Sequence, residues 1–250
     1  MTTRVVRRAT ALGWSIPVEE IGEGQPTYLM VHGYGVTSRY LRPAAELLAA
    51  RGKVLLPTMP GWRGSARPRR ALGVQELAKA LEDWMRAEQL PPMVVIGNSF
   101  GCQVITELAV FAPDLVRALV LTGPTVEPSA RTWPRMVARL FADTTREPLA
   151  LGRIIVVDYA AFGVRRSLAT GSLAMRHKIE DALPLVTAPT LVVRGSRDAL
   201  LSRHWAARCA QLVPGGRLAE IDGVGHAVNY NAPLRLTALI EEFVAEVSAT

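Results

Sequence analysis

The chain has 250 residues, of which 49% are hydrophobic and 20% charged, and its 29 Lys and Arg against 22 Asp and Glu give a formal net charge of +7. This composition excludes a largely disordered chain, and the length suits one compact domain or one domain with an inserted lobe. The two cysteines, Cys102 and Cys209, cannot form a disulfide framework, which fits a reducing, cytoplasmic location.

Arginine supplies nearly all of the positive charge, because only three residues are lysine. The basic clusters at residues 4–8 and 63–70 are not interleaved with aromatic residues and match no nucleic-acid-binding module, so we expect no nucleic-acid partner. No stretch has the length and apolarity of a membrane span, and the N-terminal segment lacks a signal-peptide cleavage pattern. We therefore expect no membrane partner and a mature N-terminus. We expect the protein to be a monomer or a homodimer.

Strand-like and helix-like segments alternate along the chain. Short apolar runs at 26–31 and 54–56 are typical of buried strands, and a helix is predicted between them at 38–50. An apolar stripe over 74–85 predicts the next helix. Further along, the same patterns predict strands at 93–96, 119–121, 190–193 and 218–221, and helices at 102–111 and 236–247. The order predicts the α/β class, with a mostly parallel central sheet covered on both faces.

Two regions depart from this alternation. Near the start, residues 14–21 and 27–31 flank the turn-forming segment Gly22–Pro26, which predicts a hairpin at the sheet edge. Residues 125–186 are rich in Arg, Leu, Met and Ala and predict two to four short helices, a helical cap inserted into the core. The predicted domains are thus a core of residues 1–124 and 187–250 and a cap of residues 125–186.

The segment Gly97-Asn-Ser99-Phe-Gly101 has the pattern G-x-S-x-G between a predicted strand and a predicted helix. The two glycines let strand and helix approach closely, and the serine is presented at the helix N-terminus, where free N–H groups favour an oxyanion. The pattern predicts that Ser99 is a nucleophile.

A serine nucleophile needs a base, and the base needs a group that fixes its tautomer. Of the four histidines, His226 follows a strand in a glycine-rich loop, where its side chain can reach the sheet crevice. His32 is expected to support a turn, His177 to lie on the surface and His204 to lie on a helix. We expect His226 to be the base.

The third member should lie between Ser99 and His226 in the chain. Asp198 comes directly after the strand and turn ending at Gly195, and the order Ser99, Asp198, His226 is the one expected for this layout. Asp222, four residues before His226, is the rival candidate, although it is better placed to end a strand or cap a loop.

An oxyanion hole needs two N–H donors. One is expected from Phe100, directly after the nucleophile, and the other from the loop His32-Gly-Tyr-Gly35, where Tyr34 is favoured over Val36.

These motifs, in this order, resemble the α/β-hydrolase superfamily, in its serine-nucleophile branch with a helical cap. The resemblance spans nearly the whole chain and includes Pro60-Gly-Trp-Arg-Gly-Ser65, which is similar to the family's Pro-Gly-x-Gly-x-Ser loop. Two positions depart from the family pattern: Thr58 and Met59 stand where an Asp often precedes that loop, and Cys102 replaces a common second glycine. The resemblance implies nucleophilic acyl transfer by Ser99, Asp198 and His226, with Cys102 a buried packing residue.

Other classes fit less well. The near-match Gly33-Tyr-Gly35-Val-Thr-Ser38 lacks the third glycine and the acidic residue of a dinucleotide site. No P-loop, H-E-x-x-H or paired C-x-x-C motif occurs, so we expect neither a cofactor nor a metal. A serine rather than an aspartate nucleophile disfavours dehalogenase and epoxide hydrolase activity. Three readings remain beside an esterase or lactonase: a carbon–carbon bond hydrolase, although Ala227 stands where such enzymes often have Trp, an acyltransferase, and a ligand receptor.

We therefore expect a serine hydrolase for a small, largely apolar ester or lactone, with activity that falls below a pKa near 6–7 as His226 is protonated. Five cap residues could line an apolar acyl pocket or form the core of the cap: Trp133, Met136, Leu140, Phe141 and Phe162. Four arginines could favour an anionic substrate if the fold brings them to the site: Arg39, Arg165, Arg166 and Arg176.

Overall fold

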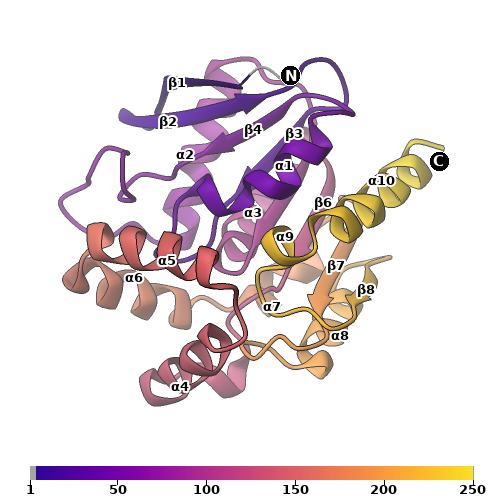
Figure 1. Cartoon of the computed structure of the whole chain (residues 1–250). Helices are drawn as coiled ribbons and strands as arrows, with labels where there is room; N and C mark the ends of the chain where they lie inside the picture. The colour runs from indigo at the N-terminus through magenta and orange to yellow at the C-terminus, as the bar shows by residue number, and fades with distance from the viewer. Residues whose placement is uncertain (1–3, 250) are drawn as a thin grey trace.

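The computed structural model describes residues 4–249 and is built around one eight-stranded sheet (Figure 1). Its strands, in the spatial order β1-β2-β4-β3-β5-β6-β7-β8, are β1 (Arg4–Ala11), β2 (Trp14–Ile21), β4 (Val54–Pro57), β3 (Tyr28–Val31), β5 (Met93–Asn98), β6 (Val116–Thr122), β7 (Thr190–Gly195) and β8 (Arg217–Ile221). All neighbours from β4 to β8 are parallel, and only β2 runs against both of its neighbours. The predicted mostly parallel α/β sheet is confirmed.

The predicted hairpin between residues 14–21 and 27–31 is wrong. Strand β2 pairs instead with β1, through a two-residue turn at Leu12 and Gly13, both with positive φ. Strand β4 lies between β2 and β3 in the sheet. The Gly22–Pro26 segment joins β2 to β3 across this gap, packed so tightly against the end of the first helix that a Cβ on Gly22 would lie 2.6 Å from the Ala49 carbonyl oxygen. Strand β1 carries no alternating apolar pattern in its sequence, because Val5 and Val6 are both exposed and only Ala9 and Ala11 are buried.

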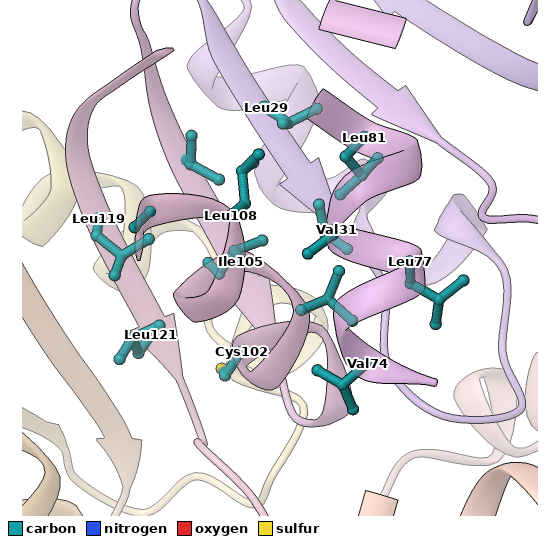
Figure 2. Packing of buried hydrophobic residues seen from close by; sticks show 14 of the residues in the cluster. Leu29, Val31, Val74, Leu77, Leu81, Cys102, Ile105, Leu108, Leu119 and Leu121 are labelled. Carbon is teal, nitrogen blue, oxygen red and sulfur yellow. The ribbon is translucent and has the colours of Figure 1, made fainter. Parts of the chain in front are cut away.

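Helices cover both faces of the sheet, as the alternating strand pattern requires. Along β3, Leu29 and Val31 face one helical layer while Tyr28 and Met30 face the other. Figure 2 shows the first layer, where residues of α2 and α3 pack onto the strands. This layer holds α2 (Val74–Ala87), α3 (Phe100–Phe111) and α8 (Arg203–Leu212). The opposite layer holds α1 (Arg42–Leu48), preceded by the 3-10 turn η1 (Ser38–Leu41), together with α9 (Val228–Asn231) and α10 (Pro233–Ala249).

Between β6 and β7 the chain forms a helical segment. It contains η3 (Pro128–Ala130), α4 (Trp133–Thr144), α5 (Leu149–Phe162), α6 (Val164–Arg176), α7 (Ile179–Ala182) and η4 (Leu183–Leu185). Helices α4, α5 and α6 gather at one end of the sheet (Figure 1), whereas Ile179 and Leu183 belong to the core beside α3. We refer to residues 125–186 as the cap, and its limits as a separate domain remain a prediction. The one remaining 3-10 turn, η2 (Pro113–Leu115), follows α3.

Candidate active site

Ser99 stands at a sharp turn between β5 and α3. Its backbone has φ 57° and ψ −120°, a strained conformation for a residue with a side chain. The turn depends on its glycines, since a Cβ on Gly97 would lie 2.8 Å from the Gly101 carbonyl carbon and one on Gly101 would lie 2.4 Å from the Val31 carbonyl oxygen. Ser99 therefore sits directly before α3, where the first N–H groups of the helix have no intrahelical acceptor.

His226 and Asp198, which lie 28 residues apart, form a buried pair. His226 Nδ1 is 2.7 Å from Asp198 Oδ2, and the other carboxylate oxygen accepts the backbone N–H groups of Leu200 and Leu201. The Asp198 carboxylate is thus fixed on three sides, and it holds the proton of His226 on Nδ1. His226 Nε2 is buried and has no hydrogen-bond partner among the described residues, so it makes no hydrogen bond with the Ser99 hydroxyl in this structure. The rival Asp222 instead accepts a hydrogen bond from the Ser196 hydroxyl.

The charge of this pair changes the pH expectation. Burial by itself would lower the pKa of His226, but the charge and hydrogen bond of Asp198, with the charges of Asp143 and Glu147, raise that pKa from 6.5 to about 9. The ring can act as a base only when it is neutral. The loss of activity that was expected below pH 6–7 should therefore begin at a higher pH, near 9.

Ser99 and His226 line one cavity of about 330 Å³ beneath the cap, together with Tyr34, Val36 and Phe100. The two expected oxyanion donors thus come from the loop after β3 and from the first residue of α3, and their role remains a prediction. Most of the lining surface is apolar. A cavity of this size suits a small organic ligand.

The five cap residues predicted to line the pocket divide into two groups. Trp133, Met136 and Leu140, which recur on one face of α4, line the cavity. Phe141 does not: it lies on the outer face of α4 and is 73% exposed. Phe162 is also outside the lining, because it closes α5 against the core, with its ring centroid 4.9 Å from that of Trp62.

A buried hydrogen-bond network that the sequence did not reveal joins the loop after β3 to the serine turn. The Gly33 N–H donates to the Tyr40 hydroxyl, which donates to Asn98 Oδ1, and Asn98 Nδ2 donates to the carbonyl and hydroxyl oxygens of Thr122. Each distance lies between 2.8 and 3.2 Å. These residues carry no motif, since their roles depend on contacts between distant segments. Tyr40 and Asn98 fix the two sides of the expected oxyanion hole relative to each other.

The other histidines have structural surroundings. His32 is fully buried; its Nε2 accepts the Met59 N–H at 3.0 Å and its Nδ1 lies 3.0 Å from the Gly33 carbonyl oxygen. Burial lowers the pKa of His32 to about 4, so the ring stays neutral and supports its turn, as expected. The predicted surface position of His177 is wrong, because its side chain is only 11% exposed and Nε2 lies 2.7 Å from Glu107 of α3.

Helix α3 also holds the cap through Gln103, whose amide donates to the Ala174 carbonyl oxygen at 2.9 Å. Cys102, on the same helix, is buried and donates to the Gly97 carbonyl oxygen. Burial raises the pKa of this thiol well above its ordinary value, so it stays protonated and unreactive.

Residues 28–239 match the sequence pattern of the alpha/beta hydrolase family, so the chain belongs to that family. A solved structure of a thermophilic esterase from Thermogutta terrifontis superposes with a TM-score of 0.81 over 98% of this chain and 99% of that one, at 21% identity, which shows the shared fold.

Two relatives are informative in different ways. A pimeloyl-[acyl-carrier protein] methyl ester esterase of Aromatoleum aromaticum is 27% identical over 255 residues, covering 88% of this chain and 98% of that protein. A probable 1-acylglycerol-3-phosphate O-acyltransferase of Oryza sativa subsp. japonica is 35% identical over 107 residues, 41% of this chain. The match spans only about a quarter of the length of that acyltransferase and of its Arabidopsis thaliana counterpart, 26% and 25%. In residues 4–249, no helix is both long enough and apolar enough to span a bilayer.

Proposed function

We propose that the protein is a serine hydrolase that cleaves a carboxylic ester or lactone of a small, largely apolar substrate through an acyl-enzyme intermediate. One observation carries the proposal: His226 is fixed by Asp198 through Nδ1 and keeps a free, buried Nε2 in the same cavity as the strained Ser99. Proton abstraction from a serine hydroxyl requires an imidazole nitrogen that is not held by another group, and the cavity shared by Ser99 and His226 is where the two would meet.

In the proposed mechanism, neutral His226 takes the proton of Ser99 as the Ser99 oxygen attacks the acyl carbonyl carbon. The tetrahedral oxyanion accepts hydrogen bonds from the N–H groups of Tyr34 and Phe100, and each donor contributes roughly 3–4 kcal/mol to the transition state. The protonated ring then donates its proton to the leaving alcohol oxygen, which departs and leaves Ser99 acylated. Water, deprotonated by His226, attacks the ester and releases the acid, while Asp198 stays ionised and holds the ring.

The N–H of Gly33 is not available for the oxyanion, because it already donates to Tyr40 at 2.8 Å. This commitment supports the choice of Tyr34, the next residue in the chain, as a donor. The apolar lining supports a largely apolar acyl or alcohol group, because the cavity offers few polar partners for a hydrophilic one.

The Ser99→Ala variant tests the proposal. With a 4-nitrophenyl acetate substrate we expect kcat/KM to fall about a thousand-fold or more, since the covalent step is lost. Ser65→Ala, on a loop outside the cavity, is the matched control and should keep the wild-type rate. Turnover that survives in Ser99→Ala would exclude the acyl-enzyme, and no turnover in the wild type across a panel of esters and lactones would favour a ligand receptor.

Acyl transfer to an alcohol is the second candidate, favoured by the 107-residue match to the acyltransferase. Both reactions share the acyl-enzyme and differ only in whether water or an alcohol attacks it. Adding increasing concentrations of a primary alcohol during ester turnover separates them: a transferase forms the new ester as its main product, whereas a hydrolase releases mainly the acid.

A further inference from the structure

The cavity has a charge opposite to that of the whole protein. The chain has a formal net charge of +7, yet within residues 4–249 no Arg or Lys side chain lines the cavity. Asp143 and Glu147 do line it. None of the four arginines that could have favoured an anionic substrate lines the cavity, and two of them have partners elsewhere: Arg39 pairs with Asp158, and Arg166 donates to the Pro68 carbonyl oxygen.

Asp143 is a buried carboxylate with an unused oxygen. It lies near the end of α4, is 8% exposed, and its Oδ1 has no hydrogen-bond partner among the described residues. Burial raises the pKa of Asp143 to about 6, with opposing contributions from the charge of His226 and the Ala199 backbone. The carboxylate is therefore ionised above neutral pH. A buried charge without a partner is costly, so this oxygen is suited to a ligand that brings one.

Glu147 lies four residues after Asp143, in the turn between α4 and α5, and lines the same cavity near His226. Its carboxylate accepts hydrogen bonds from the Ala227 N–H and the Asn231 amide, both just beyond His226 in the chain. None of these donors carries a positive charge. Asp198 pairs with His226 and does not line the cavity, so Asp143 and Glu147 are the carboxylates that face its interior, with no Arg or Lys among the described lining residues.

We propose that Asp143, assisted by Glu147, forms a subsite for a positively charged group, a protonated amine, on an otherwise apolar substrate. The inference deepens the proposed hydrolase function and rests on it. A protonated amine would give Asp143 Oδ1 its missing donor and would form a charge-assisted hydrogen bond, which is stronger than one between neutral groups. A carboxylate at the same place would be repelled by both side chains.

Three aryl esters of matched length test this subsite: the 4-nitrophenyl esters of 6-aminohexanoic acid, heptanoic acid and adipic acid, which end in a cation, a methyl group and an anion. For the wild type at pH 8 we expect kcat/KM to be about tenfold higher for the cationic ester than for the neutral one, mainly through KM, and lowest for the anionic one. Asp143→Asn should remove most of the cation preference while the neutral ester keeps its KM. Glu242→Gln, which removes an equal charge from the exposed face of α10, should keep the preference.

A second measurement uses only the wild-type protein, in case Asp143→Asn does not fold. Hexylamine, hexanol and hexanoate are titrated against the protein in a thermal-shift assay, and we expect the ammonium to raise the melting temperature most. Equal preference for the three esters, or equal effects of the three ligands, would overturn the subsite. If every ester is inert but hexylamine alone still stabilises the protein, the hydrolase proposal fails and the amine subsite stands.

Discussion

Two buried histidines show how this fold uses the same side chain in opposite ways. His32, in the loop after β3, and His226, in the loop after β8, are both enclosed by the protein. The ring nitrogens of His32 contact backbone groups only, and burial lowers the pKa of His32 to about 4. Burial acts on His226 in the same direction, but the Asp198 carboxylate outweighs it and the pKa rises to about 9. The neighbour, and not the depth of burial, decides whether the ring can carry a proton.

The largest expected effect comes from making His226 resemble His32. In Asp198→Asn the carboxylate that fixes the ring is gone, so both the tautomer and the charge stabilisation are lost, and kcat/KM should fall by about 10³–10⁴-fold. Steady-state ester kinetics measure this. Asp181→Asn, an exposed residue of α7, controls for loss of an aspartate elsewhere. A loss of less than tenfold would show that another group orients the ring.

A smaller effect is expected from a substitution that crowds His226 and Asp198 while both residues are kept. A Cβ at Gly123 would lie 2.8 Å from His226 Cε1 and 2.9 Å from Nδ1, so Gly123→Ala should displace the ring and reduce kcat by roughly 10- to 100-fold. Gly215→Ala is the matched control, since Gly215 has a similar positive φ of 71° against 63° but its Cβ would meet nothing within 4 Å. Equal losses in both variants would attribute the effect to backbone strain alone.

The pH dependence should follow the raised pKa of His226. For a neutral ester, kcat/KM should increase with pH and level off above about pH 9, because only the neutral ring accepts the Ser99 proton. Asp143→Asn removes one of the charges that raise the pKa of His226. The pH at which kcat/KM is half of its maximum should therefore fall, by less than the shift that Asp198 itself causes. A rate that is flat from pH 6 to pH 9 would contradict the assignment of His226 as the base.

His32 and His226 should also make opposite contributions to the pH dependence of the free energy of unfolding. His32 has a lower pKa folded than unfolded, so its contribution is present above pH 6.5 and lost as the pH falls from 6.5 toward 4, at a cost of about 3 kcal/mol. His226 has a higher pKa folded, so its contribution is present below pH 6.5 and lost as the pH rises toward 9.

Urea unfolding of His32→Gln between pH 4 and 7 isolates the contribution of His32 to stability. Of the variants considered, His32→Gln should reduce kcat/KM least. The variant should lose the acid-side slope of the wild type, whereas His204→Gln, at an exposed position of α8, should retain it. An unchanged slope in His32→Gln would mean that other groups cause the acid sensitivity.

What the sequence could predict depended on local patterns. Ser99, Asp198 and His226 could be singled out because each follows a recognisable strand, and parallel strands end at the same edge of a sheet. The contact between Asp198 and His226 agrees with that reasoning. The pairing of β2 with β1 could not be deduced, because β1 lacks an alternating apolar pattern: Val5 and Val6 are exposed, and only the small residues Ala9 and Ala11 are buried. Asp143 was also missed, since nothing in its local sequence shows that α4 turns it inward.

Helix α3 begins next to Ser99 and, within its next two turns, holds the final part of the cap through Gln103 and Glu107. The proposed nucleophile and the cap are therefore both positioned by the same helix. Changes in α4 could then alter which molecules are accepted without disturbing the serine turn. Such a division would let new specificities arise by mutation in the cap while the reactive centre stays intact.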